Sequence, residues 1–227
     1  MQLPEEKNYI ESDVLLVHKP TGITSFDVIR RLRRILNIKK IGHAGTLDPL
    51  ARGLMIVGIQ TGTKKMNNYL KLPKTYIAEI QCGFSTDTGD LEGDVVEEKR
   101  VIKADFKKKH VEDIVEGMVG AHEFEAPLYS ALKVEGKPLY WYARNNKQPP
   151  FIPIKSMAVE KIQVLDQYIS GATYIIKVRV QVGSGTYIRT LAEVIGKRLG
   201  YPATLKSLYR VTIDMHRDED AYRLPEN

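Results

Sequence analysis

The sequence predicts a mixed α/β (α+β) fold in a single domain spanning residues 1–227. Short apolar or alternating segments typical of strands are interspersed, in irregular order, with segments whose apolar residues recur at helical spacing. Hydrophobic residues make up 43% of the chain, enough for a sizeable core. The sequence has no solenoid-type repeat and no low-complexity tract, which excludes repeat architectures and long disordered segments.

The first expected elements are a strand, a turn and a helix. The apolar run Val14–Val17 predicts a buried strand, and a turn follows at Lys19–Gly22. A helix should begin at Thr24 or Ser25, because either hydroxyl can cap it, and end near Leu36. Its apolar face is formed by Val28, Leu32, Ile35 and Leu36.

Arginines occupy much of the remaining surface of this predicted helix, at positions 30, 31, 33 and 34. Such a face is often ordinary solvated surface. The whole chain, however, has 34 Lys and Arg against 28 Asp and Glu, and this net charge of +6 suits a polyanionic partner. The pattern leaves two interpretations open: solvated surface, or a surface that binds RNA phosphates.

The run Gly42–Pro49 predicts a rigid loop that presents a carboxylate and an imidazole. Gly42 and Gly45 permit positive φ or close approach of another backbone, and Pro49 pushes Asp48 away from the α region. Loop chemistry alone also allows an Asx-type turn in which Asp48 caps its own backbone. The choice between a catalytic and a structural aspartate therefore depends on the rest of the chain.

The middle and C-terminal parts continue the mixture of strands and helices. Strands are expected at residues 54–59, 76–82, 130–134, 151–165, 173–182 and 204–213, and helices at residues 61–70, 105–118, 138–144 and 187–199. Aromatic residues in the third of these helices are interleaved with Lys137 and Arg144, so they suit either RNA contact or a small core.

Several classes of protein are disfavoured. Cys82 is the only cysteine, so no intrachain disulfide can form. No apolar stretch approaches the roughly 20 residues of a membrane helix, and Met1–Glu11 lacks the apolar region of a signal peptide, so we expect a cytoplasmic protein. The five histidines have no metal-ligand spacing, and the polar loop Ser85–Asp94 lacks the EF-hand pattern, so no metal is expected.

Considered together, several motifs resemble the TruB-type tRNA pseudouridine synthases. No single motif identifies the family, but the order and spacing of the motifs across residues 12–212 do. The matching segments are Lys19–Ser25, Gly42–Ala51 with Gly53, Thr61–Lys64, Lys74–Tyr76, Thr86–Thr88 with Asp90, Glu92 and Gly93, Tyr129–Lys133 with Gly136 and Lys137, Tyr142–Arg144, and Gly185–Leu191.

The resemblance implies an enzyme that isomerises uridine to pseudouridine at position 55, in the T loop of tRNA. It implies a catalytic fold built on a long, mostly antiparallel sheet, with a mobile insertion at about residues 125–153 that closes on the T arm. Metal and organic cofactors are not used by this family. The expected partner is the T-arm stem-loop of tRNA. Neither a membrane nor a guide RNA is expected as a partner, and we expect a monomer.

The resemblance also assigns residues to the reaction. Asp48 matches the essential aspartate, which acts as the nucleophile or as the base that starts glycal formation. Arg189 matches the arginine that pairs with this aspartate, and Tyr76 matches the tyrosine that stacks on the target base. Tyr187 matches a second active-site ring, and Leu208 matches an apolar wall of the pocket.

Further residues match the RNA-binding parts of the family. His43 matches the histidine that fills the space left by the flipped base. Lys19 and Pro20 match a loop beside the site. Lys64, with the arginine-rich helix, is expected to contact phosphates.

The sequence departs from the family pattern at two points, and two other functions compete with the one that the resemblance implies. Ala44 replaces the usual Thr, and no PUA-type RNA-binding domain is evident after the last matched strand. One rival is a guide-dependent synthase of the dyskerin type, although the segments Tyr129–Lys133 and Tyr142–Arg144 favour the stand-alone enzyme. The other is a non-catalytic RNA-binding protein on the same scaffold.

Overall fold

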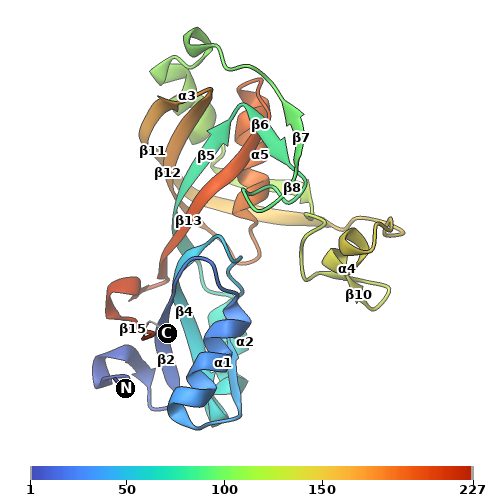
Figure 1. Cartoon of the computed structure of the whole chain (residues 1–227). Helices are drawn as coiled ribbons and strands as arrows, with labels where there is room; N and C mark the ends of the chain where they lie inside the picture. The colour runs from blue at the N-terminus through green and yellow to red at the C-terminus, as the bar shows by residue number, and fades with distance from the viewer. Residues whose placement is uncertain (1, 226–227) are drawn as a thin grey trace. The chain divides into compact units, whose positions relative to one another are not determined.

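The structure, a computed structural model, describes residues 2–225. The chain divides into two compact units (Figure 1). Unit 1 contains the described residues up to Ile77 and from Leu208 onwards, and unit 2 is formed by Ala78–Ser207. Both units combine helices with mostly antiparallel strands, which confirms the predicted mixed α/β class.

Unit 1 is built on a small sheet with two helices. Its strands are β1 (Tyr9–Glu11), β2 (Val14–Lys19), β3 (Ile41–His43), β4 (Arg52–Ile59), the second half of β13 (Ala203–Ile213), β14 (His216–Arg217) and β15 (Tyr222–Arg223). The order β1-β2-β4-β13 is extended by β3 on β4, β14 on β13 and β15 on β2. Only the β13–β4 and β15–β2 pairs among these are parallel. The helices are α1 (Ser25–Leu36) and α2 (Met66–Leu70), and 3₁₀ turns lie at Glu6–Asn8, Gln60–Lys65 and Asp218–Asp220.

The boundaries predicted for the first helix are confirmed. Thr24 is the N-cap and accepts a hydrogen bond from the backbone of Asp27, whose side chain in turn accepts from the backbone of Thr24. The helix ends at Asn37, which adopts the left-handed conformation at φ 53°. Val28, Ile29 and Leu32 are its most buried apolar residues.

Unit 2 contains most of the longer strands. Its strands are most of β5 (Lys74–Cys82), β6 (Phe84–Thr86), β7 (Val95–Glu98), β8 (Gly120–Glu125), β9 (Lys133–Val134), β10 (Lys137–Pro138), β11 (Ile154–Ser170), β12 (Thr173–Val182) and the first half of β13. The path β5-β12-β11-β8 forms its main sheet. Its helices are α3 (Lys108–Glu116), α4 (Leu139–Arg144) and α5 (Ile188–Arg198), with a 3₁₀ turn at Lys103–Asp105.

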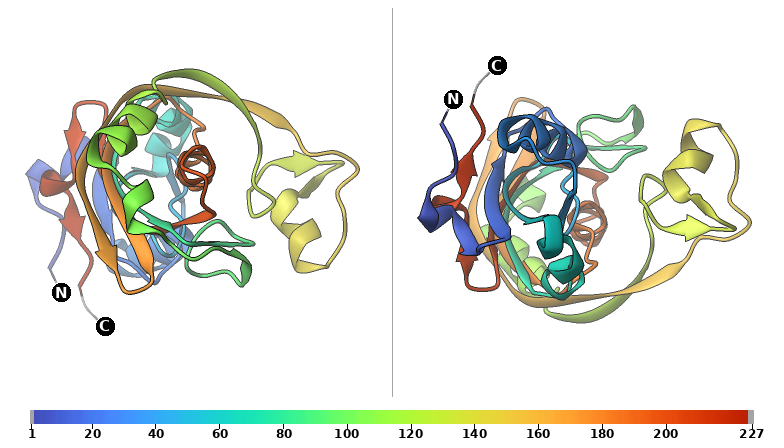
Figure 2. Two further views of the ribbon diagram at one scale, coloured as in Figure 1. Left: turned by 90° about the horizontal axis from the view of Figure 1, so that it is seen from above. Right: turned by 90° about the horizontal axis from the view of Figure 1, so that it is seen from below.

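The segment that carries β9, β10 and α4 projects from the rest of unit 2 (Figure 2). It lies within the predicted insertion at residues 125–153. A cluster of its own holds it together, with Ala126, Val134, Leu139 and Tyr142 buried and Leu132 and Trp141 packed against them. The segment therefore has a small core, separate from the sheet.

The structure differs from the sequence prediction in several elements. The helix predicted at residues 61–70 is a 3₁₀ turn at Gln60–Lys65 followed by α2; within this turn Gly62 lies so close to Asp13 that a Cβ would be 2.0 Å from its carbonyl oxygen. The helix predicted at 105–118 begins at Lys108, since Phe106 adopts a non-helical conformation. The strand predicted at 130–134 is reduced to Lys133–Val134.

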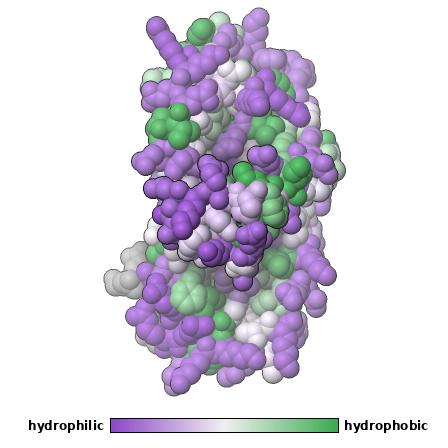
Figure 3. Space-filling view, turned by 90° about the vertical axis from the view of Figure 1, so that its right-hand side faces the viewer, coloured by the Kyte–Doolittle hydropathy of each residue, from purple (hydrophilic) through white to green (hydrophobic). Residues whose placement is uncertain are grey.

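Within residues 2–225, no helix is long and apolar enough to cross a membrane. Hydrophilic side chains cover most of the face of the protein shown in Figure 3, with apolar side chains in small groups among them.

Candidate active site

The candidate catalytic carboxylate, Asp48, lies in the loop between β3 and β4 of unit 1. These strands pair antiparallel, with His43 opposite Val57, so the loop starts and ends on a fixed frame. Gly45 has φ +100°, a conformation that strongly favours glycine. The side chain of Asp48 is half-buried. The strands and the glycine together fix the path of the backbone that carries the carboxylate.

A buried lysine holds the C-terminal side of this loop. Lys19, at the end of β2, is 0% exposed. Its ammonium group donates hydrogen bonds to the carbonyl oxygens of Pro20 at 2.9 Å, Pro49 at 3.2 Å and Ala51 at 2.6 Å. Because two of these oxygens belong to residues just after Asp48, the lysine ties the loop to the strand beside it. Lys19 thus has a positioning role within unit 1.

The first residue of α1 holds the other side of the loop. The Ser25 hydroxyl donates to the Leu47 carbonyl at 3.0 Å and accepts from the Leu47 backbone N–H at 2.8 Å. The backbone N–H of Gly22 donates to the Pro49 carbonyl at 2.9 Å. The residues on both sides of Asp48 are therefore bonded to the turn and helix that follow β2.

Arg210, on β13, is a part of the site that sequence reasoning missed. It is 1% exposed, and its Nε donates to the Leu54 carbonyl at 2.6 Å while one terminal nitrogen donates to the Gly45 carbonyl at 3.3 Å. The guanidinium group thus links β13 to the loop and to β4. No local pattern in the strand signals this role, because both partners are distant in sequence.

The charge of Arg210 affects two neighbouring bases. Burial lowers the pKa of His43, and the charge of Arg210 lowers it further, so the imidazole is neutral at pH 7. Burial also lowers the pKa of Lys74 to about 8, again with a contribution from Arg210. The Lys74 ammonium donates to the carbonyls of Leu70 and Leu72.

Other residues singled out from the sequence also lie in unit 1. Tyr76 on β5 and Leu208 on β13 are buried. Pro20 is half-buried, and Lys64 is exposed in the 3₁₀ turn before α2. Unit 1 therefore provides both apolar and cationic groups of the predicted set.

Arg189 and Tyr187 lie in unit 2, at the start of α5. Arg189 is 5% exposed and donates to the carbonyls of Thr88 at 2.6 Å and Tyr129 at 2.9 Å. The backbone N–H of Tyr187 donates to the sulfur of Met157 at 3.2 Å. The guanidinium group is thereby fixed against two loops of its own unit, and its pairing with Asp48 stays a prediction.

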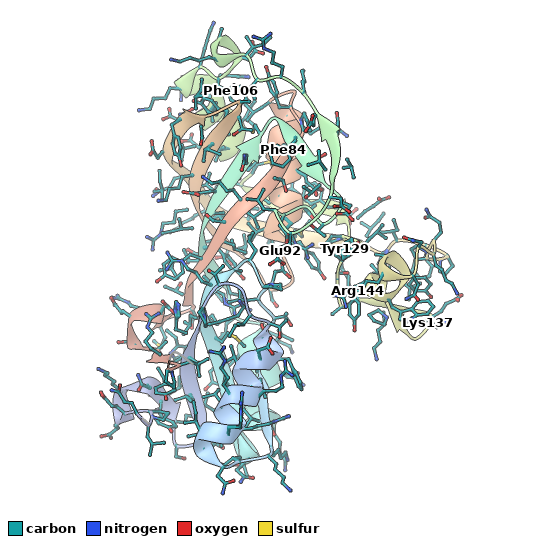
Figure 4. All side chains as sticks on the ribbon, viewed as in Figure 1. Phe84, Glu92, Phe106, Tyr129, Lys137 and Arg144 are labelled. Atoms are coloured by element: carbon teal, nitrogen blue, oxygen red, sulfur yellow. The ribbon has the colours of Figure 1, made fainter. Side chains whose placement is uncertain are left out.

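The projecting segment of unit 2 carries cations stacked on aromatic rings. Lys137 lies 4.1 Å from the centre of the Trp141 ring, and Arg144 lies 5.5 Å from that of Tyr140. Figure 4 shows Tyr129 where this segment leaves the rest of unit 2, with Arg144 and Lys137 further out. Tyr142 is instead buried and donates to the Val134 carbonyl. The small-core interpretation is therefore confirmed for Tyr142, and RNA contact by the other rings stays a prediction.

Metal ligands do not gather in the part of the chain that the structure describes: residues 2–225 contain no group of three or more His, Cys, Asp or Glu side chains able to hold an ion. The described residues of unit 1 bring a half-buried carboxylate, a neutral imidazole and two buried cations to the loop of Asp48.

The chain is similar to known RNA-modifying proteins. Residues 33–188 match the family described as "TruB family pseudouridylate synthase (N terminal domain)". The tRNA pseudouridine synthase B of Staphylococcus aureus strain MSSA476 is 42% identical over 200 residues, which are 87% of this chain. The same protein of strain JH9 matches to the same extent. The chain spans 65% of the length of these relatives.

Two solved structures have a similar fold. A chain in the crystal structure of a Cbf5-Nop10-Gar1 complex has a TM-score of 0.68 and 28% identity, covering 95% of this chain and 53% of that chain. A chain of an H/ACA RNP bound to a substrate RNA containing 2'-deoxyuridine has a TM-score of 0.66 and 24% identity, covering 93% of this chain and 51% of that chain.

We expect the substitution Lys19→Met to lower the free energy of unfolding by roughly 2–4 kcal/mol, because it leaves several buried carbonyls without their donor. Urea unfolding followed by circular dichroism measures this change. Lys71→Met, at an exposed lysine of unit 1, is the matched control and should change stability little. Equal losses in both variants would contradict the role assigned to Lys19.

We expect the His43 imidazole to titrate below its ordinary pKa of 6.5. In the window just below pH 6.5 the unfolded chain binds a proton at this position and the folded chain does not, so the stability contributed by His43 falls as the pH is lowered. Histidine NMR resonances followed against pH measure the midpoint, and the variant His43→Gln identifies the signal. A midpoint at or above 6.5 would contradict the proposed electrostatics.

Proposed function

The chain belongs to the TruB family of pseudouridylate synthases, and on this premise we propose that it isomerises uridine to pseudouridine in tRNA. The target we propose is the uridine at position 55 of the T loop. The observation that carries this proposal is the loop of Asp48, which buried side chains on three elements hold in one conformation. The 42% identity to a tRNA pseudouridine synthase B supports tRNA as the substrate.

The reaction exchanges one glycosidic bond for another. The bond from ribose C1' to N1 of the base breaks, the base rotates, and a bond from C1' to C5 forms while C5 loses its proton. Asp48 starts the reaction in its ionised form, either by attack as a nucleophile or by removing a proton from the ribose. The reaction is an isomerisation, so neither an oxidant nor a second substrate is needed.

The remaining residues support this carboxylate and the base. In this proposal Arg189 is the cationic partner of Asp48, a task suited to a guanidinium because it is always charged and can bond bidentately. Tyr76 stacks on the target base, and Leu208 and Tyr187 complete the apolar and aromatic walls. The burial of Tyr76 and Leu208 is consistent with a dry pocket for the base.

Access to the target requires that the base leave its stack, which costs a few kcal/mol. His43 fills the vacated position as a neutral ring, in agreement with the lowered pKa of its imidazole. The exposed cation Lys64 contacts phosphates, and the projecting segment with its paired cations and aromatic rings binds the T arm. Lys19 and Pro20 act beside the site, with the Lys19 ammonium shaping the loop.

The alternative is a synthase that depends on a guide RNA. It is the dyskerin-type rival named from the sequence; for comparison, the chain in the Cbf5-Nop10-Gar1 complex is 28% identical to this one. The higher identity to tRNA pseudouridine synthase B, 42%, favours the stand-alone enzyme. An assay without any guide RNA separates the two.

The test is release of tritium from an unmodified tRNA transcript labelled at uridine C5, measured with the protein alone. We expect one equivalent of tritium per tRNA from the wild type. We expect at least a thousandfold slower release from Asp48→Asn, a near-isosteric change that removes the charge, with tRNA binding largely retained.

The matched control is Asp214→Asn, which alters an exposed turn aspartate of the same unit and should leave release unchanged. Release by Asp48→Asn at the rate of the wild type would remove Asp48 from the mechanism. No release by the wild type, despite tight tRNA binding, would favour the guide-dependent enzyme or a protein that only binds RNA.

A further inference from the structure

The solvent-facing side of α1 carries an ordered group of cations. At 100° per residue, the buried residues Val28, Ile29 and Leu32 occupy one side of the helix. Arg30 and Arg34 lie on the opposite, exposed side, and Arg31 and Arg33 lie half-buried on the two flanks. We define these four residues as the arginine surface. The fold of unit 1 requires a buried side of α1, but it does not require guanidinium groups at these four positions.

An exposed aromatic ring organises two of these cations. Phe26 is 55% exposed, so it contributes little to the core of unit 1. The guanidinium carbons of Arg30 and Arg33 each lie 5.6 Å from the centre of its ring. Arg30 also pairs with Asp27. Cation–π attraction and the ion pair thus limit the freedom of these side chains before any ligand binds.

The arginine surface borders an open, shallow hollow of about 690 Å³, lined by Ile23, Asp27 and all four arginines. A single carboxylate therefore faces four guanidinium groups. Four guanidinium groups against one carboxylate leave an excess of positive charge around the hollow. The hollow is suited to an anion with several oxygens.

The arginine surface begins close to the proposed catalytic loop. Ser25, the first residue of α1, is hydrogen-bonded to Leu47, the residue before Asp48. The 12 residues of α1 span about 18 Å, so the surface extends no more than ~20 Å from this loop. The surface is therefore within reach of an RNA arm whose uridine enters at this loop.

We infer that the arginine surface of α1 binds the phosphodiester backbone of the RNA arm that contains the target uridine. This inference rests on the proposed function for the identity of the RNA. The guanidinium groups recognise phosphate oxygens by paired, charge-assisted hydrogen bonds. The contacts position the RNA and carry no sequence information.

The test compares two double variants with equal changes in charge. Arg31→Gln/Arg34→Gln removes two cations while leaving the Phe26 contacts and the Asp27 pair intact. The matched control, Lys108→Gln/Lys109→Gln, removes two exposed lysines of α3 in unit 2. Circular dichroism confirms that each variant is folded. Kd is measured for a full tRNA transcript and for an isolated T-arm stem-loop, between about 50 and 200 mM salt.

We expect the arginine variant to bind both RNAs at least tenfold more weakly at the lowest salt, and the slope of log K against log salt to fall by about 1.5. The lysine variant should change Kd less than twofold. Equal Kd and slope in the two variants would overturn the inference, as would a loss confined to full tRNA. Binding of poly-glutamate that depends on Arg31 and Arg34, with RNA binding unchanged, would assign the surface to an acidic protein and also overturn it.

Different measurements test the proposed reaction and the inference about the arginine surface. Tritium release by the wild type reports on the proposed reaction, whereas the salt slopes report on the arginine surface. Release without any effect of the arginine variant contradicts only the inference. An effect of the arginine variant on RNA affinity without release by the wild type contradicts only the proposed reaction.

Discussion

The conformation of one loop, held by buried cations, is the constraint on which the site depends. Lys19 and Arg210 direct their charged nitrogens at backbone carbonyls on either side of Asp48. A buried cation is costly unless its donors are satisfied, so this arrangement tolerates little movement of the loop. The position of the carboxylate is thus set by the backbone of the loop between β3 and β4, and less by rotation of its own side chain.

Burial and the charge of Arg210 together affect the protonation of two neighbouring groups. The charge of Arg210 lowers the pKa values of both His43 and Lys74, whose charged forms burial already disfavours. A neutral imidazole can occupy apolar space left by a flipped base without the desolvation cost of a charge. Arg210, which no sequence motif identified, therefore links the geometry of the catalytic loop to the electrostatics around it.

Sequence patterns predicted the elements with strong local signals. The cap and apolar spacing fixed α1, and clean alternation predicted β12, while the glycines and Pro49 predicted the rigid loop of Asp48. The role of Arg210 could not be predicted, because its partners Leu54 and Gly45 lie 156 and 165 residues away. Strand β8 was missed because Gly120–Glu125 is polar and gains its strand character from pairing with β11. The pairing of Asp48 with Arg189 stays a prediction from resemblance.

The position of the product tests the central claim most directly. An unmodified tRNA transcript is incubated with the protein alone and treated with a carbodiimide that forms a stable adduct on pseudouridine, and the adducts are mapped by primer extension. The account predicts a single stop, at the T-loop uridine 55, that disappears when this uridine is replaced by cytidine. No stop, or stops at uridines elsewhere in the tRNA, would contradict it.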